Sequence, residues 1–291
     1  MTFINPKTDY AFKKIFGSSE SKDILISFLN ALVYEGNATI EDLEIINPNL
    51  PPKVEGLKDT YLDVKAQLSD GTLVIIEMQV LNVQSFGKRV FYNTAKTYAF
   101  QLQAGEGYRM LKPVIALTIT DFEMFPSNRN LISRFVYKEV KTNLVYPDNE
   151  IDLIFVELPK FTKEEQELET LADKWIYFMK NARSLTSVPE TMDIIPEIHK
   201  AFDIANQARL SPEEITNMEK IEQFIYDQQG AMLKATLEAR EEGKEEGREE
   251  GMREKARSIA RQLLSRLDDE TISQTTGLSL EDIRNLRSPD S

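Results

Sequence analysis

The chain has 291 residues, of which 41% are hydrophobic and 9% aromatic, as in an ordinary globular protein. The sequence contains no cysteine and one histidine, His199, which excludes disulfides, thiol nucleophiles, cysteine-ligated zinc and zinc sites built on several imidazoles. Its net charge of −13 argues against a surface that is basic throughout. Any catalysis is therefore expected to use carboxylates, Lys or Tyr, with a hard metal ion bound by oxygen.

The apolar runs of the sequence predict no membrane segment. None of them approaches the roughly 20 residues needed to span a bilayer. The first residues, Met1 to Gly17, are charged and lack the apolar stretch of a signal peptide. We therefore expect a cytoplasmic protein with no membrane contact.

Helices and strands alternate in the first half of the sequence. Helical periodicity predicts helices over residues 7–16, 21–34 and 84–103, and alternating or β-branched runs predict strands over residues 59–68, 72–80, 113–120, 135–141 and 152–158. The helix over residues 84–103 would bury an apolar stripe formed by Phe91, Ala95, Ala99 and Leu102. The pattern is typical of a mixed α/β domain.

After Pro159 the predicted elements are all helices. They cover residues 162–181 and 194–207, and a long helix begins at Ser211-Pro212, an N-cap followed by proline at the first helical position. We therefore place a domain boundary near residue 160. The predicted regions are an α/β domain at 1–160, a helical extension at 161–210, the long charged helix at 211–267 and a helical hairpin tail at 268–291.

The segment from Tyr61 to Val80 reads as a β-hairpin. Ser69-Asp70-Gly71 suits a three-residue loop with glycine in a left-handed conformation, and this loop places Asp63 opposite Glu77. A two-residue Asp-Gly loop would shift the register by one residue and put the two acids on opposite faces. We choose the three-residue loop because it pairs apolar with apolar residues on the other face. That face carries Leu62, Val64, Ala66, Leu68, Val74, Ile76, Met78 and Val80.

Two carboxylates that face each other across a sheet repel, and a cation between them would reverse that effect. Mg²⁺ or Mn²⁺, held by Asp63, Glu77, a backbone carbonyl and waters, is the arrangement that we predict. Such a cation activates a water molecule and neutralises charge on a phosphoryl group. The alternative is a half-exposed hairpin whose two acids are solvated, with Lys65 as their salt-bridge partner.

The order of these residues resembles known nucleases. Asp63, the hairpin and then Glu77-Met78-Gln79 resemble the PD-(D/E)XK nuclease superfamily. The opening Asn5-Pro6-Lys7-Thr8-Asp9-Tyr10-Ala11-Phe12-Lys13-Lys14-Ile15-Phe16-Gly17, the helix over residues 89–98 and the downstream Glu-Gly repeats are similar to the bacterial recombination-promoting nuclease and transposase-like family, the Rpn group. The resemblance covers nearly the whole chain.

The resemblance implies a fold and an activity. The fold would be a restriction-endonuclease-like core, with a mixed central sheet flanked by helices, followed by an all-helical C-terminal extension. The activity would be Mg²⁺-dependent endonucleolytic hydrolysis of DNA, in recombination or mobile-element processes. Asp63 and Glu77 match the metal-binding acids, the Met78 carbonyl matches the backbone ligand, and Asp9 matches an accessory acid.

Gln79 departs from the superfamily pattern, because it stands where a lysine is usual. A glutamine can form hydrogen bonds with the nucleophile or the scissile phosphate, but it brings no positive charge. Lys65, on the same predicted face, is our candidate for the missing charge. The departure also keeps a second hypothesis open, in which the chain is a non-catalytic DNA-binding or assembly protein that retains the nuclease fold.

Basic residues concentrate in one segment despite the negative net charge. Residues 84–141 contain nine Lys or Arg and four acids. Within it, Arg89, Tyr92 and Lys96 are spaced three and four apart and would share one helix face. Basic side chains beside an aromatic ring suit a DNA backbone and a splayed base, so we predict a DNA-binding face here. An ordinary solvated helix face is the alternative.

The long C-terminal helix has small residues at every fourth position. They are Ala231, Ala235, Ala239, Gly243, Gly247 and Gly251. Its three glycines cost roughly 3 kcal/mol relative to alanine, so close approach of a second helix is one reason to keep them. We therefore predict a homodimer that forms through the C-terminal helices. A charged, partly frayed tether is the alternative.

The tail resembles a helix-turn-helix hairpin over residues 269–286, with Gly277 in the turn and Ser279 as N-cap. Its second helix places Glu281 and Asp282 beside its arginines, which is unfavourable for contact with phosphate. We therefore expect this element to pack within or between subunits rather than to read DNA.

Overall fold

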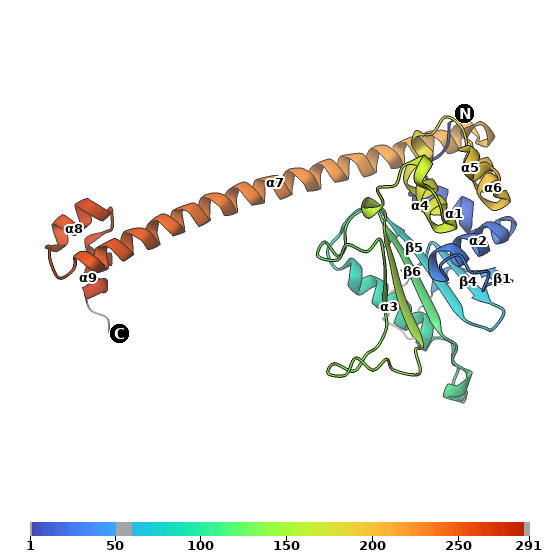
Figure 1. The fold of residues 1–291 in the computed structure, drawn as a ribbon, viewed down its shortest axis with the longest axis horizontal. Coiled ribbons are helices and arrows are strands. Elements are labelled where there is room, and N and C mark those ends of the chain that lie inside the picture. Colours follow the sequence, from blue (N-terminus) through green and yellow to red (C-terminus); the bar gives the residue numbers. More distant parts are fainter. Residues whose placement is uncertain (1, 51–59, 288–291) are drawn as a thin grey trace. The chain divides into compact units, whose positions relative to one another are not determined.

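The computed structural model describes residues 2–50 and 60–287 (Figure 1), so Asp59, at the start of one predicted strand, and the last four residues of the predicted tail lie outside the described residues. The chain divides into two compact units, Met1–Ile225 and Tyr226–Ser291. We had predicted a boundary near residue 160, and the structure places the division about 65 residues later.

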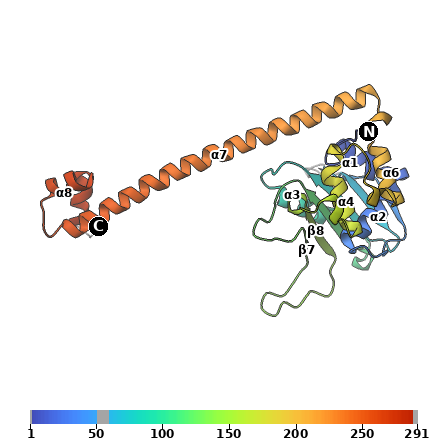
Figure 2. The same ribbon diagram turned by 45° about the horizontal axis from the view of Figure 1, so that its top comes forward.

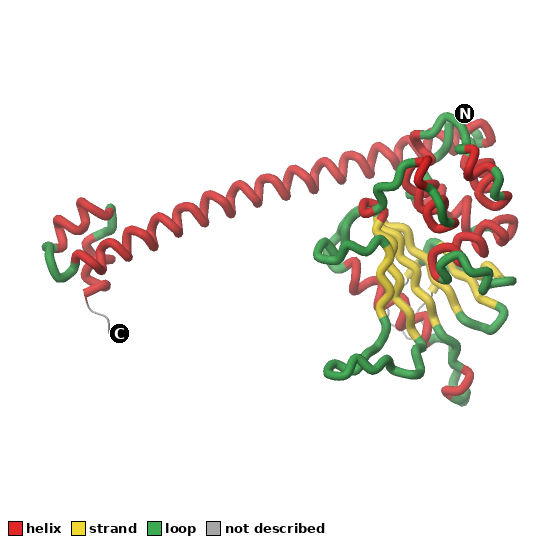
Figure 3. Tube along the Cα trace, viewed as in Figure 1, coloured by secondary structure: helices red, strands yellow, loops and turns green. Residues whose placement is uncertain are grey.

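The first unit is built on a mixed six-stranded sheet. Its strand order is β1-β4-β5-β6-β8-β7, in which β5, β6 and β8 are parallel and the remaining pairings are antiparallel. The strands of this sheet are β1 Leu43–Ile46, β4 Val64–Leu68, β5 Leu73–Gln79, β6 Val114–Thr120, β7 Ile132–Phe135 and β8 Ile151–Glu157. A separate short pair is formed by β2 Asn49–Leu50 and β3 Thr60–Tyr61. Figure 3 shows the strands as yellow tubes between helices.

Helices of the first unit cover both faces of the sheet. The helices of the described chain, in both units, are α1 Asp9–Phe16, α2 Lys22–Val33, α3 Phe86–Ala99, α4 Leu171–Asn181, α5 Glu190–Asp193, α6 Pro196–Ala205, α7 Pro212–Leu263, α8 Asp269–Thr276 and α9 Leu280–Arg287. Short 3₁₀ turns lie at Ser19–Ser21, Tyr108–Met110, Leu158–Lys160, Glu165–Glu167, Ala182–Ser184 and Gln207–Arg209. Helices α1, α2, α4 and α6 gather on one side of the sheet and α3 lies on the other (Figures 1 and 2). The predicted fold class, a mixed central sheet flanked by helices with a helical C-terminal extension, is confirmed.

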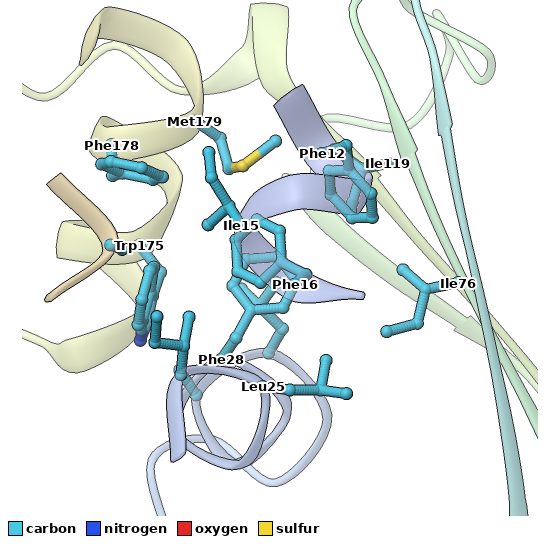
Figure 4. Close-up of a cluster of buried hydrophobic side chains, with 14 of the residues drawn as sticks. Phe12, Ile15, Phe16, Leu25, Phe28, Ile76, Ile119, Trp175, Phe178 and Met179 are labelled. Atoms are coloured by element: carbon cyan, nitrogen blue, oxygen red, sulfur yellow. The ribbon is translucent and has the colours of Figure 1, made fainter. Parts of the chain in front are cut away.

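The main core joins the N-terminal helices to the helices that follow residue 160 (Figure 4). The ring of Trp175 on α4 packs edge-on against Phe28 of α2, with 5.5 Å between ring centroids, and lies 5.9 Å from Phe16 of α1. Its indole nitrogen donates a hydrogen bond to Ser27. Residues 161–210 therefore belong to the same packed unit as the sheet and do not form the separate region that we predicted for them.

The predicted hairpin register is confirmed from Val64 to Gln67, but the predicted pairing of Asp63 with Glu77 is not part of the ladder. Val64 pairs with Ile76 and Gln67 with Leu73, while the Leu68 amide donates to the Thr72 carbonyl across the three-residue loop. Gly71 has a φ of +90°, the left-handed conformation for which glycine is suited. A bend just before β4 breaks the alternation of side chains. Leu62 consequently lies in a second apolar cluster with Leu50, Leu73 and Ile75 rather than in the main core.

The buried face of α3 differs from our prediction. Phe91, the first residue of the predicted apolar stripe, is 49% exposed. The buried residues are Phe86, Val90, Asn93, Thr94, Lys96 and Thr97. The two threonine hydroxyls donate to carbonyls within the helix, 2.7 Å for Thr94 and 2.8 Å for Thr97. Their polar atoms are thereby satisfied, so these small residues can face the sheet without a desolvation penalty.

Other element boundaries also differ. The strand predicted over residues 135–141 is instead β7, which ends at Phe135, and β1 was not predicted. The helix predicted over residues 162–181 begins only at Leu171, where Thr170 forms a capping box with Asp173. That box satisfies free backbone amides at the helix start, which fixes where the helix begins.

The C-terminal unit contains most of α7, followed by α8 and α9. The long helix that we predicted is confirmed, although it ends at Leu263. Ala260 of α7 packs with Ile272, Leu278 and Ile283 in a small buried cluster. Gly277 ends α8 with a φ of +74°, as expected for the turn of a helical hairpin. Among the described residues, no helix combines the length and the apolar character needed to cross a membrane.

Candidate active site

A cleft of about 950 Å³ opens where α1, the C-terminal end of β5 and the start of α3 meet. Its lining residues are Asp9, Lys13, Thr60, Tyr61, Asp63, Glu77, Met78, Gln79, Val83, Gln84, Ser85, Phe86, Lys88, Arg89, Tyr92 and Asn93. The cleft therefore brings together most of the side chains that the sequence singled out. Lys65 and Lys96 are not part of its lining.

Two aspartates share one side of the cleft. Asp63 lies in the bend before β4, and its carboxylate accepts a hydrogen bond of 2.7 Å from the Met78 amide. Asp9 lies in the first turn of α1, where Lys13 forms an ion pair of 2.7 Å with it. The Lys13 ammonium is also 3.7 Å from Asp63. Helix α1 thus places a carboxylate, Asp9, and an ammonium group, Lys13, at the end of the hairpin.

The two aspartates differ in their affinity for a proton. Burial raises the pKa of Asp63 to about 7, and a hydrogen bond with Asp9 contributes in the same direction. The Met78 amide and Lys13 oppose that rise. Burial also works against ionisation of Asp9, but hydrogen bonds from Asp63 and Lys13 outweigh it and lower the pKa of Asp9. Of the two carboxyl groups, Asp63 therefore binds a proton more tightly.

Glu77 is held on the other side of the cleft by α3. Its side chain is 10% exposed, and the Asn93 side-chain amide donates to it at 2.7 Å. The Arg89 Nε lies 3.8 Å from the second carboxylate oxygen. The amide oxygen of Asn93 is buried and has no hydrogen-bond partner within the described parts of the chain. This oxygen belongs to the amide that binds Glu77, and it is an uncharged ligand available to a cation.

Gln79 connects the end of β5 to α3. Its side-chain nitrogen donates to the Leu81 carbonyl at 2.7 Å, and its side-chain oxygen accepts from Arg89 Nη2 at 2.6 Å. The Arg89 guanidinium also lies over the Phe86 ring, 5.0 Å from its centroid. Gln79 is thus oriented at both ends of its amide. The sequence did not predict this contact.

Two predicted site residues lie elsewhere. The prediction that Lys96 presents its charge to DNA is wrong, because Lys96 is only 5% exposed and donates to the Leu50 carbonyl at 2.6 Å. Lys65 is the second residue of β4, paired with Ile46 and Ile75, where burial lowers its pKa, and it does not line the cleft. The cation next to the acids is Lys13, which sequence reasoning missed. Its position four residues after Asp9 on a helix was the available signal.

The donor set of the cleft suits a hard divalent cation. Among the residues that the structure describes, no group of three or more acidic or histidine side chains is arranged as a metal site. Mg²⁺ does not require one, since it commonly takes one or two carboxylates and completes its shell with waters and substrate phosphates. Asp63, Glu77 and the orphaned Asn93 oxygen are all oxygen donors that line this cleft. Oxygen atoms are the ligands that Mg²⁺ and Mn²⁺ prefer.

The mixed sheet, with acids at the hairpin and at the end of β5, agrees with the core expected of a PD-(D/E)XK nuclease domain. Residues 6–235 match the model of a family described as PD-(D/E)XK nuclease family transposase. This match covers more than half of the chain, which therefore belongs to that family. Residues 253–288 match a second model, described as Rpn/YhgA-like nuclease family, C-terminal HTH domain. Comparisons with curated proteins and with solved structures gave no match.

The two matches confirm the family that the sequence resembled. The second identifies the C-terminal hairpin as a helix-turn-helix domain, a class that supports DNA binding. Within this unit, Asp282 of α9 faces Arg253 and Arg257 of α7 at 3.6 and 3.7 Å. Arg287 forms an ion pair of 2.7 Å with Asp269. These contacts pack the hairpin against α7, but the match with a helix-turn-helix model goes against our expectation that the tail does not bind DNA.

Proposed function

We propose that this chain is a divalent-metal-dependent DNA endonuclease, which hydrolyses phosphodiester bonds in recombination or mobile-element processes. The observation that carries the proposal is the convergence of Asp63 and Glu77 on one cleft in a chain of the PD-(D/E)XK nuclease family. Carboxylates that converge on one cleft supply the oxygen ligands that a hard divalent cation prefers.

Asp63, Glu77 and the Met78 carbonyl are the proposed ligands of Mg²⁺ or Mn²⁺. When bound, the cation supplies Lewis acidity that activates water and offsets charge on the phosphate. Asp9 remains as the accessory acid, with Lys13 as its ion-pair partner at 2.7 Å. Tyr92, which lines the cleft and is 38% exposed, offers a ring against which a base can stack.

The second candidate function is a non-catalytic DNA-binding or assembly protein. Gln79 favours it, because both ends of this amide are engaged by Leu81 and Arg89 rather than by a reacting group. Plasmid nicking separates the two functions. A nuclease converts supercoiled plasmid to open circles in Mg²⁺ or Mn²⁺ and leaves it intact when chelator is added. DNA binding without any nicking in either metal would favour the second candidate.

We also propose a homodimer formed through the C-terminal helices. On α7, large apolar side chains are exposed at Tyr226, Leu233, Leu237 and Met252. Within the C-terminal unit as described, a Cβ added at Gly243, Gly247 or Gly251 would meet nothing within 4 Å, so packing inside that unit gives no reason for these glycines. A two-fold dimer would bury such a surface.

The dimer can be tested by sedimentation. The full chain is expected to sediment with twice the monomer mass at micromolar concentration, and a chain ending at Ile225 as a monomer. Monomers in both cases would make α7 a tether, and a double-strand break would then require successive nicks.

A further inference from the structure

Arg89 lines the cleft, whereas Lys65, the residue that the sequence suggested for a positive charge at the phosphate, does not. The PD-(D/E)XK superfamily that this chain resembles usually has a lysine where Gln79 stands, whereas glutamine has no charge to offer a phosphate. We propose that Arg89 supplies this charge to the scissile phosphate and that Gln79 is the residue that positions it. The inference rests on the proposed nuclease function and assigns roles within the same site.

Three contacts fix the Arg89 guanidinium at the end of β5. They are the hydrogen bond of 2.6 Å to Gln79, the stacking on Phe86 at 5.0 Å and the approach to Glu77 at 3.8 Å. The side chain nevertheless remains 47% exposed. A guanidinium has five N–H donors, and one of them is used by Gln79. The group is therefore held in place while part of its donor edge remains open to the cleft.

Lys13 and Lys88 are the other cations that line the cleft, and each suits this task less well. Lys13 is 2.7 Å from Asp9 and 3.7 Å from Asp63, so its charge is offset by the acids that a metal ion would need. Lys88 is exposed on the first turn of α3. Within the described chain, Arg89 has a single acid nearby, Glu77 at 3.8 Å, and its hydrogen bond of 2.6 Å goes to the neutral amide of Gln79, which orients the guanidinium without a direct ion pair.

Gln79 and Arg89 form a matched pair. The Gln79 oxygen faces Arg89 only because its nitrogen is fixed by the Leu81 carbonyl, at 2.7 Å. A lysine at this position would place a second positive charge next to the guanidinium, and like charges at such separations repel. Lysine at 79 and arginine at 89 are therefore alternatives. This predicts that Gln79→Lys is harmful alone but beneficial once Arg89 has been removed.

Four variants test the pair: Arg89→Ala, Gln79→Ala, Gln79→Lys and the double variant Gln79→Lys with Arg89→Ala. Lys88→Ala serves as the charge-matched control, since it removes the same charge one residue away. The first readout is kcat and KM for plasmid nicking in Mg²⁺. The second is calorimetric binding of deoxythymidine 3′,5′-bisphosphate, with Mg²⁺ and with chelator. This probe has no diester to cleave, so the second readout does not depend on catalysis.

Arg89→Ala is expected to lower kcat by about a hundredfold or more, the range found when a donor to developing charge is removed. Gln79→Ala is expected to lower kcat by about tenfold with little change in KM. The double variant should recover kcat to within about tenfold of wild type and should bind the bisphosphate more tightly than Arg89→Ala. Lys88→Ala should act on KM far more than on kcat.

Two results would overturn the inference. One is an Arg89→Ala variant that keeps wild-type kcat and bisphosphate affinity. The other is a double variant that has a wild-type melting temperature but shows no gain over Arg89→Ala in either readout. If the wild type nicks no plasmid in either metal, the nuclease proposal fails, and bisphosphate binding alone then decides whether Arg89 and Gln79 form a phosphate site.

Discussion

Asp63→Ala and Glu77→Ala are each expected to lower the rate of DNA nicking by about a thousandfold or more. Removing either carboxylate takes away a ligand and a negative charge from the proposed cation site, and enzymes accelerate phosphoryl transfer mainly by positioning the reactants and stabilising charge. Nicking rates should be measured over a range of Mg²⁺ and Mn²⁺ concentrations. This separates weaker cation binding from a slower reaction.

Glu44→Ala is the matched control for these variants. Glu44 is an exposed acid on β1 and does not line the cleft, so its removal is expected to leave the rate unchanged. If Asp63→Ala or Glu77→Ala nicks plasmid as fast as this control, the assignment of the two acids is wrong.

The raised pKa of Asp63 predicts that replacing this residue changes how the stability of the chain depends on pH. This pKa rises from 3.8 to about 7 on folding, so the folded chain binds the Asp63 proton more tightly than the unfolded chain does. The stabilisation is complete below pH 3.8 and is lost as the pH rises through 7. Asp63→Asn does not titrate. Without metal, its melting temperature relative to wild type should therefore increase between pH 5 and pH 8.

A constant or decreasing difference would mean that Asp63 is already ionised at pH 5. The measurement needs chelator, because a bound cation would stabilise the ionised form of the wild type and would hide the effect.

The sequence was sufficient to predict the hairpin and much of the cleft. Side chains alternate along strands with a period of two, and Gly71 can adopt the left-handed conformation that a three-residue loop needs. These local rules set the register of β4 and β5, and with it the approach of Asp63 to the end of β5. The family resemblance added Asp9, whose contact with Asp63 no local rule predicts.

The exposed and buried faces of α3 could not be predicted in the same way. Hydropathy ranks Phe91 as a buried residue and Lys96 as an exposed one, and the structure reverses both. The burial of Lys96 depends on the carbonyl of Leu50, which is 46 positions away in the sequence. Periodicity within one helix carries no information about such a partner. Gln79 and Arg89 are likewise brought together by the packing of α3 at the end of β5.

The predicted domain boundary near residue 160 was wrong for a related reason. The composition changes after Pro159 because strands give way to helices, and we interpreted this change as the end of a domain. The apolar side chains of α4 nevertheless pack against α1 and α2, which precede the sheet. Trp175 and its hydrogen-bond partner Ser27 are 148 residues apart. A local change of secondary structure marks a domain boundary only where few contacts cross it.

Trp175→Ala tests directly whether the helices after residue 160 belong to the nuclease unit. The Trp175 side chain is fully buried, and its ring contacts Phe16, Phe28 and Phe178 at centroid distances of 5.9, 5.5 and 5.8 Å (Figure 4). Truncation would leave a cavity between α4 and the N-terminal helices. We expect the free energy of unfolding to fall by about 3–5 kcal/mol, the usual cost of replacing a buried tryptophan or phenylalanine by alanine.

Chemical denaturation followed by far-UV circular dichroism gives this free energy, with Phe91→Ala as the control. Phe91 is half exposed on α3, so its removal should cost less than about 1 kcal/mol. Because α1 carries Asp9 and Lys13 to the cleft and packs on the same core, Trp175→Ala should also weaken nicking at temperatures where the control remains fully active. If both variants unfold at the same denaturant concentration as wild type, α4 does not stabilise the N-terminal helices. The domain boundary would then lie near residue 160.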